Sequence, residues 1–406
     1  MRNLLQSKKA GSILAIVMIL IVVLVVTGGA MLALGSQSRA FAIRDGSQIT
    51  ARCAADAGLT KAICEMNAKL QTGEMSDSSL PQVTDEAVPG VYAAFSYQVA
   101  VKSSKGGKEY TITSIGNSAY AEKTVSATLR LRGCGEYAVL AQDHIELKAN
   151  TLVDGFNCAN PSDTSVQVQI GTTSVSHDKV VLNNGVVVDG DVFVGVGGNV
   201  DAVIKDMGAK TGDRYAMWEE PDFPVITAPL LPAMGKIQVK GKDQLITPAE
   251  SGKYTSIDLQ QKATVSARLV ISGGKVVLHI TDNIDLGQGC EIVVMPGASL
   301  NLYVSGNIKS GEGAGFNNEN IPANFKLWGL ATDKQEFQLN AKSSCLGQIY
   351  APNANAIVKA KGDLYGAFTA KSFEMKSGGN LFYDGSLRNV NTDDEGVRFV
   401  VSRWSE

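Results

Sequence analysis

The sequence predicts an α+β fold that is mainly β: a long N-terminal helix, a small antiparallel β-meander and an irregular β-solenoid. Three observations support this prediction. An apolar segment without charges opens the chain, a segment of alternating residues follows, and short β-branched runs separated by Gly, Asn and Asp fill the rest. With 406 residues, of which 44% are hydrophobic, the chain can bury a sizeable core.

Composition and charge narrow the classes of function. Lys and Arg number 37 and Asp and Glu number 40, which gives a net charge of −3. A chain that binds nucleic acid normally carries a basic excess or a basic stripe, and the sequence has neither, so we expect no nucleic-acid partner. Three His residues leave little material for a His-rich metal centre.

Residues 13–34 are predicted to span a membrane. No charged residue lies between Lys9 and Arg39, and about 20 apolar residues at about 1.5 Å each cross a hydrocarbon core of about 30 Å. Arg2, Lys8 and Lys9 precede the span, which predicts a cytoplasmic N-terminus. A cleaved secretory signal and an ordinary single-span anchor are the alternatives.

The helical pattern continues past the span, so we predict one helix over residues 12–70. Apolar residues recur mostly at steps of three and four, charged residues fall between them, and no Pro interrupts them. The predicted buried stripe consists of Phe41, Ile49, Ala55, Leu59, Ile63, Met66 and Leu70. Residues 71–90 are rich in Gly, Ser and Pro and are predicted to be a linker.

Two β regions are predicted after the linker. Residues 91–133 alternate in the manner of an antiparallel meander. Residues 134–390 change from strand to corner every five or six residues, a rhythm that favours a β-solenoid-like domain. Related phrases recur at Gly190-Asp191-Val192-Phe193-Val194, Gly362-Asp363-Leu364-Tyr365-Gly366 and Gly379-Asn380-Leu381-Phe382-Tyr383.

Two segments stand apart from this rhythm. Residues 215–234 contain several prolines, so we predict an excursion that interrupts the strands. Residues 391–406 end the chain with an alternating run, which predicts a capping strand. An irregular β-sandwich in place of the solenoid is the alternative fold.

The N-terminal motifs resemble a known family. The basic leader, residues 1–11, ends in Gly11 and is followed by Ser12 and the apolar run; Ala51-Arg52-Cys53-Ala54-Ala55-Asp56-Ala57-Gly58-Leu59 and Tyr110-x-Ile112-x-Ser114-x-Gly116 come later. Together they resemble PilX-like minor pilins of type IV pili, which carry class III, prepilin-type signals. The resemblance implies cleavage by a prepilin peptidase between Gly11 and Ser12. It also implies an inner-membrane location, a periplasmic bulk and other pilin-like subunits as partners.

Ile16 departs from the family pattern. Major pilins carry a glutamate at this fifth mature position, where the family pairs it with the N-terminal amine of a neighbouring subunit. A carboxylate in lipid is tolerated only when it is paired, so Ile16 argues against a major, repeating filament subunit. Tip and priming subunits of related secretion filaments share this feature.

Residues with catalytic potential are sparse, and we expect neither an enzyme nor a cofactor. His144 and Glu146 share one face of a predicted strand, but a zinc site needs three or four ligands. Two close pairs of carboxylates suit solenoid corners, although solenoid enzymes that act on sugars use such acids. These pairs are Asp189 with Asp191 and Asp282 with Asp285.

The six cysteines form an even number in a compartment expected to be oxidising. Cys53 and Cys64 lie about 16 Å apart along one helix, too far for a disulfide. Cys134 and Cys158 form the candidate disulfide. The remaining two cysteines are either facing positions of the coil or buried thiols.

The sequence therefore predicts a minor pilin-like component of a type IV pilus or a related secretion filament, anchored in the inner membrane. Its expected roles are assembly, tip priming or adhesion, with a surface or a carbohydrate as ligand. A membrane-tethered β-solenoid that binds or processes carbohydrate is the alternative, with a groove of clustered acids and aromatics as its signature. A purely structural envelope protein is a third hypothesis.

Overall fold

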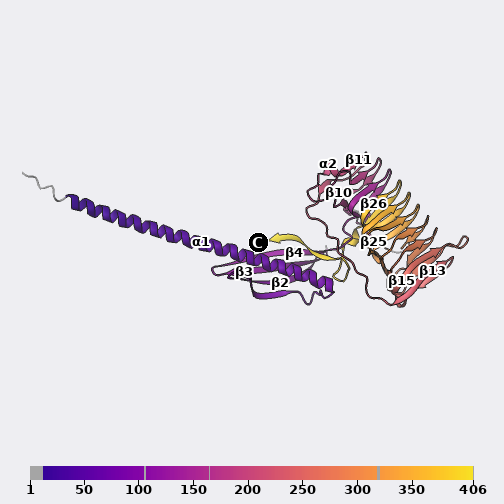
Figure 1. Cartoon of the computed structure of the whole chain (residues 1–406), viewed down its shortest axis with the longest axis horizontal. Coiled ribbons are helices and arrows are strands. Elements are labelled where there is room, and N and C mark those ends of the chain that lie inside the picture. Colours follow the sequence, from indigo (N-terminus) through magenta and orange to yellow (C-terminus); the bar gives the residue numbers. More distant parts are fainter. Residues whose placement is uncertain (1–11, 105–106, 164, 318–320, 406) are drawn as a thin grey trace, which may run out of the picture. The chain divides into compact units, whose positions relative to one another are not determined.

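A computed structural model describes residues 12–104, 107–163, 165–317 and 321–405. The chain forms two compact units, which are described separately. The first consists of residues 1–130 together with 399–406, and the second of residues 131–398. The predicted fold class is confirmed, since a long helix and an antiparallel sheet are followed by a large β-rich domain (Figure 1).

Helix α1 (Ser12–Thr72) is continuous through the apolar and the amphipathic segments. At about 1.5 Å per residue it is about 90 Å long. Gly28 and Gly29 lie within it and do not interrupt it, while the hydroxyl of Thr27 donates to the carbonyl of Val23 at 2.7 Å. The polar groups of this apolar segment are therefore satisfied within the helix itself.

The sheet of the first unit is antiparallel and has the order β1-β2-β3-β4-β28. Its strands are β1 (Gln82–Ala87), β2 (Ala93–Ser104), β3 (Gly107–Ser118), β4 (Ala121–Arg132) and β28 (Arg398–Ser405). Strand β1 lies inside the segment predicted as a linker, where it pairs with β2. Strand β28 comes from the segment predicted as a cap and adds to the edge beside β4.

Small side chains let α1 approach this sheet closely. The helix contacts β2 and β3, and the residues that it buries most deeply are Ala51, Ala54, Ala55, Leu59, Ala62 and Met66. The predicted stripe is wrong in its first part, because Phe41 and Ile49 are 63% and 66% exposed. The prediction relied on the large apolar side chains at those positions, whereas full burial of α1 residues starts at Ala51. A polar contact with the sheet comes slightly earlier, since the hydroxyl of Ser118 donates to the carbonyl of Ser47 at 2.9 Å.

The sheet contributes the motif Tyr110-x-Ile112-x-Ser114-x-Gly116 of β3 to this contact with α1. Alternate residues of β3 point to one face of the sheet, and all four are buried. A Cβ atom added at Gly116 would lie 2.1 Å from the carbonyl oxygen of Ala51 and 2.4 Å from the amide nitrogen of Ala55. Glycine is thus required here by the helix backbone.

The second unit is a stack of parallel coils built from two arms. The first arm contains β5 (Val139–Leu147), β6 (Leu152–Phe156), β7 (Val168–Thr172), β8 (Val180–Leu182), β9 (Val187–Val188), β10 (Gly190–Val194), α2 (Val200–Val203), β11 (Ile204–Asp206) and β12 (Arg214–Ala216). Strand β5 pairs with β7 and β8, β7 with β10, and β10 with β12, all parallel. The first arm therefore coils away from β5.

The second arm begins at its outer end. Its strands are β13 (Ala233–Lys240), β14 (Asp243–Ile246), β15 (Gly252–Gln260), β16 (Arg268–Ile271), β17 (Lys275–Ile280), β18 (Ile284–Leu286), β19 (Glu291–Val294), β20 (Ser299–Val304), β21 (Ile308–Ser310), β22 (Gly315–Phe316), β23 (Phe325–Gly329), β24 (Gln335–Leu339), β25 (Ser344–Val358), β26 (Asp363–Met375) and β27 (Asn380–Asp384). Short 3₁₀ helices lie at Pro248–Glu250, Pro322–Asn324 and Gly385–Arg388.

At their inner ends the two arms meet through strand pairing alone. Strand β26 pairs with β5, with one register shift between Ala370 and Ser372, and β27 pairs with β6; both pairings are parallel, and we call them together the seam. Along the stack the sequence runs through residues 233–384 and then through 139–216. The chain therefore enters the solenoid in its middle, coils to one end, restarts at the other end and returns to the seam.

An inner ladder of apolar side chains crosses the seam unbroken. Each member pairs in register with the next one, and all are at most 3% exposed. The ladder consists of Leu278, Leu302, Leu327, Ile349, Phe368, Val139, Ile170 and Val192. Burial of such side chains contributes about 1.5–3 kcal/mol each, so the seam is held by the same hydrophobic core as the coils.

Residues 217–232, which we call the strap, connect the two outer ends. Ten strand spacings separate β12 from β13 along one register of outward residues, about 48 Å at about 4.8 Å each. That register runs through Tyr215, Phe193, Gly171, Leu140, Thr369, Tyr350, Trp328, Tyr303, His279, Lys253 and Ala233. At about 3.1 Å per residue in a proline-rich extended segment, the strap reaches about 53 Å. It can therefore follow the solenoid from end to end, and its prolines favour that conformation.

A Gly116→Ala substitution tests the close approach of α1 to the sheet. The new methyl group meets helix backbone that cannot turn away, so we expect a loss of about 1–3 kcal/mol in the free energy of unfolding. Chemical denaturation of the full chain in detergent measures it. Gly46→Ala is the matched control, since a Cβ there has no neighbour within 4 Å. Equal stability of the two variants would contradict the packing.

Candidate functional site

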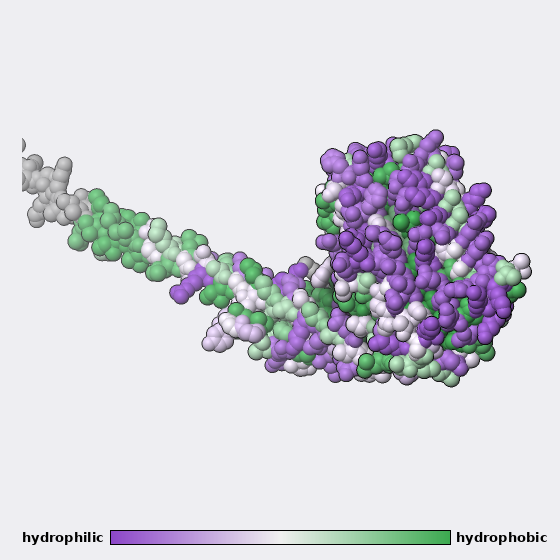
Figure 2. Space-filling model, turned by 45° about the vertical axis from the view of Figure 1, so that its right-hand side comes forward, coloured by the Kyte–Doolittle hydropathy of each residue, from purple (hydrophilic) through white to green (hydrophobic). Residues whose placement is uncertain are grey.

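The first candidate site is the uncovered half of α1. Every residue from Leu14 to Arg44 is exposed, among them the whole apolar run. This helix is long and apolar enough to cross a membrane, and Figure 2 shows its N-terminal part as a continuous hydrophobic surface. Such an apolar surface is unusual on a soluble protein, and it is compatible with a single membrane span.

The predicted processing residues lie at the start of this helix. Gly11 is outside the described residues, and Ser12 is the first residue of α1. Ile16 lies on the uncovered part and is 60% exposed. Its side chain offers only apolar surface. This end of the helix therefore presents no side-chain charge between Leu14 and Ser38.

The second candidate site is the face of the solenoid under the strap. Tyr303, Trp328 and Tyr350 follow one another in register on this face and are at most 2% exposed. Their rings contact each other, with centroids 6.5 and 5.9 Å apart. Phe223 and Ile226 of the strap pack against them. The strap thus turns an outward aromatic ladder into a second small core.

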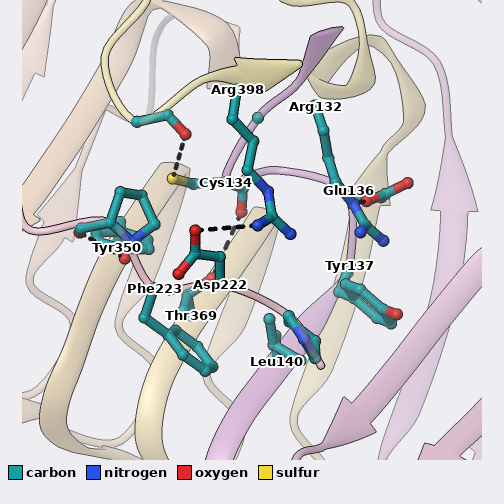
Figure 3. A pocket seen from close by; sticks show the side chains of 14 residues that line it. Arg132, Cys134, Glu136, Tyr137, Leu140, Asp222, Phe223, Tyr350, Thr369 and Arg398 are labelled. Carbon is teal, nitrogen blue, oxygen red and sulfur yellow. Dashed lines mark hydrogen bonds and ion pairs between the residues drawn. The ribbon is translucent and has the colours of Figure 1, made fainter. Parts of the chain in front are cut away.

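Polar contacts fix the strap and the segment that leaves the solenoid beside it. The hydroxyl of Tyr350 donates to the carbonyl of Pro224 at 2.8 Å. Arg398 pairs with Asp222 of the strap at 3.0 Å (Figure 3). Lys326 pairs with Asp394 at 2.5 Å. The strap is therefore held by the solenoid below it and by the exit segment next to it.

A small cleft remains between these elements (Figure 3). Its volume is about 40 Å³, enough for one or a few water molecules. Arg132 and Glu136 form an ion pair at its edge. Charges are paired and the thiol of Cys134 faces the carbonyl of Gly396 at 3.5 Å. The cleft is suited to fixing the strap rather than to holding a substrate.

The predicted disulfide between Cys134 and Cys158 is not formed, because both thiols are free. Cys134 lies under the strap and the exit segment, whereas the sulfur of Cys158 lies 3.2 Å from the hydroxyl of Ser386. Burial raises the pKa of the Cys134 thiol to about 12. Burial, followed by a hydrogen bond with Asp384, raises the pKa of Cys158 to about 11. Both are therefore protonated and weakly nucleophilic near neutral pH.

The other residues weighed from the sequence lie apart from one another. His144 is on β5, where it pairs in register with Ser372, while His279 is on β17 in the outward register. Burial, and then Lys253, lowers the pKa of His279. Within the part of the chain that the structure describes, no group of three His, Cys, Asp or Glu side chains is placed to hold a metal ion.

The aspartate pairs have different surroundings. Asp189 and Asp191 line an open hollow of about 760 Å³ on the first arm. Asp285 lines a smaller hollow of about 200 Å³ on the second arm. Asp191 accepts a hydrogen bond from the amide of Asp213 at 2.9 Å, as expected of a corner residue.

Sequence reasoning missed the aromatic ladder and the strap that covers it. Tyr303, Trp328 and Tyr350 are separated by 25 and 22 positions, and only the coil register brings them together. The prolines of residues 215–234 predicted an excursion that interrupts the strands, but not the surface that it follows. A weak signal existed in the recurrence of aromatic residues at similar intervals.

Comparisons with known proteins give a match to a protein family and likenesses among solved structures. Residues 232–390 match the family described as "Domain of unknown function (DUF7305)". No curated protein matches the chain. Among solved structures, the chain is similar to the competence-associated pilin ComZ from Thermus thermophilus, with 13% identity over 89% of this chain and 97% of that chain and a TM-score of 0.23. None of these assigns a function to this chain.

Cysteine alkylation tests the free thiols. With a pKa of about 12, only about one Cys134 in ten thousand is a thiolate at pH 8. We expect the exposed Cys53 and Cys64 to be alkylated quickly and Cys134 slowly, as measured by mass spectrometry of peptides. Recovery of a Cys134–Cys158 cross-linked peptide, or equal rates for Cys134 and Cys53, would contradict the described environment.

Tyr350→Phe tests how the strap is held. It leaves the carbonyl of Pro224 without this donor, which costs about 1 kcal/mol. Because Cys134 lies under the strap, we expect its alkylation rate to rise about fivefold. Tyr254→Phe is the matched control, since that hydroxyl donates to the carbonyl of Glu250 at 2.8 Å, away from the strap. Equal alkylation in both variants would contradict the role of Tyr350.

Proposed function

We propose that this chain is a minor pilin-like subunit of a type IV pilus or related filament system, which waits in the bacterial inner membrane and displays a β-solenoid. One observation carries the proposal. A single helix leaves about half of its length uncovered and apolar, while its other half packs tightly on a small antiparallel sheet. The N-terminal motifs that resemble prepilin-type signals support it.

The physical mechanism is an exchange of apolar environments. In the membrane, lipid covers the segment from Leu14 to Leu34. During assembly the same surface leaves lipid and is covered by helices of neighbouring subunits. Lipid is as apolar as these side chains, so the segment exchanges one apolar environment for another. If extraction from lipid and packing against neighbouring helices occur together, the segment is not exposed to water. The sheet holds the other half of α1, so the helix moves together with that sheet.

Ile16 supports a minor rather than a repeating subunit. A glutamate at this position would require a partner charge in an apolar environment. Ile16 makes no such demand, so the subunit can lie next to lipid or at the end of a filament without an unpaired charge. Roles in priming or at the tip follow from this property, and we expect no catalytic activity from the chain.

Processing by a prepilin peptidase is the direct test. The full chain is co-expressed in bacterial membranes with an active prepilin peptidase or with a catalytically inactive one, and intact mass spectrometry identifies the N-terminus. We expect loss of residues 1–11 only with the active enzyme, with Ser12 as the new first residue. Processing leaves α1 complete, so the product stays in the membrane.

Matched variants make this result specific. Gly11→Val should block processing because it changes the residue at the scissile bond, whereas Gly35→Val lies far along the helix and should be processed normally. An unprocessed wild-type chain in the presence of the active peptidase would overturn the prepilin proposal. Release of a soluble fragment that begins beyond Leu34 would instead identify a secretory signal.

A further inference from the structure

An outward stripe of aromatic and acidic side chains crosses the seam. Tyr365 of β26 pairs in register with Phe382 of β27, and Phe382 pairs with Asp154 of β6. Their neighbours Leu364, Leu381 and Val153 are buried, so the stripe faces outward. Two members come from the second arm and one from the first.

The aromatic part of the stripe, which we call the platform, is a stack of rings. The rings of Tyr365 and Phe382 stack with centroids 5.0 Å apart and an interplanar angle of 22°. Phe156 meets the ring of Tyr365 edge-on, with centroids 6.1 Å apart. All three side chains are half-buried, so their edges are fixed by packing while part of each ring stays accessible. Such a surface suits a flat ligand with an apolar face.

The acidic part of the stripe borders the hollow of about 760 Å³, which Asp154 and Asp189 line together with Gln167 and Lys210. The amide of Asp189 donates to the carbonyl of Val153 at 2.8 Å, which places Asp189 beside Asp154. The carboxylate of Asp154 accepts only from the amide of Gly155, at 2.7 Å, among the described residues.

The other polar side chains of the hollow differ: Asp191 accepts from the amide of Asp213 and Thr211 accepts from the guanidinium of Arg214, whereas three others make no such contact. The side chains of Gln167, Asp189 and Lys210 have no hydrogen bond or ion pair with any other residue that the structure describes. Acceptors, an amide and an ammonium group therefore converge on one hollow without partners in the protein. A groove with a few converging polar groups beside aromatic surface is the usual form of a ligand site.

We propose that the platform and the hollow bind a glycan built from neutral or amino sugars. A sugar ring has an apolar C–H face, which packs on Tyr365 and Phe382, and a rim of hydroxyl donors, which suit the carboxylates of Asp154 and Asp189. Hydrogen bonds to ionised acceptors are the stronger kind. Three carboxylates against one ammonium in the hollow disfavour acidic sugars, because like charges would meet there.

This inference does not depend on assembly into a filament. The site belongs entirely to the second unit, so glycan binding and peptidase processing can succeed or fail separately. Glycan binding should also affect the stability of the fold, because Phe382 and Asp154 belong to different arms. A bound glycan that contacts both would stabilise the seam.

The test uses the full chain in detergent on an array of neutral, amino-sugar and uronic-acid oligosaccharides, followed by calorimetric titration with the best oligosaccharide. We expect retention of neutral or amino-sugar glycans and a rise in melting temperature when they bind. Phe382→Ala should weaken binding at least tenfold, and the conservative Asp154→Asn should weaken it severalfold.

The control is Tyr215→Ala, which removes an exposed ring whose centroid lies 5.7 Å from that of Phe193, outside the stripe. It should bind as the wild type does. No retention of any neutral or amino-sugar glycan would overturn the proposal, as would a preference for uronic acids or binding of Ca²⁺ alone. Unchanged affinity in folded Asp154→Asn and Phe382→Ala variants would overturn it as well.

Discussion

Apolar side chains along the first half of α1 cannot remain in water, and this constraint determines where the chain can reside. The fifteen large apolar side chains from Leu14 to Leu34 are between 47% and 77% exposed on the isolated chain. At about 1.5 kcal/mol for each such side chain, their transfer out of water is worth on the order of 20 kcal/mol, more than the usual stability of a whole domain. A bilayer is therefore an environment that suits the helix.

Hydropathy alone could predict the extent of α1 but not the surface it uses. The absence of charges between Lys9 and Arg39 and the lack of Pro predicted the helix and its membrane-crossing segment. The buried face was predicted from large residues such as Phe41 and Ile49, which are exposed. The contact is made instead by alanines and by Gly58, whose added Cβ would lie 2.5 Å from the hydroxyl oxygen of Ser114. Small residues carry little hydropathy, so only the partner strand reveals that they form an interface.

The solenoid shows a different limit. The alternation of short β-branched runs with Gly, Asn and Asp was visible in the sequence, and the related motifs around Tyr365 and Phe382 do pair in register. The order of the coils was not predictable, because β26 lies more than 200 residues after its partner β5. Neither strand carries a sequence feature that identifies the other as its partner. Proline content predicted that residues 217–232 leave the strands. Their path follows only from the chain order, since a chain that restarts at the far end needs a connection as long as the stack.

Because of this chain order, the pairing at the seam also determines which residues of the two arms lie next to each other. Within one continuous arm, stacked residues are joined through the coil that separates them, so their register is set by covalent geometry. Phe382 and Asp154 belong to different arms, and their register depends on the pairing of β27 with β6. The platform and the hollow therefore form one surface only when the last coil of the second arm has docked on the first coil of the first arm. The strap restricts how far the arms can separate, and the ion pair of Asp222 with Arg398 ties it to the segment that leaves the seam. A ligand that contacts the whole stripe therefore binds only after the two arms have paired, because each arm alone supplies only part of the stripe.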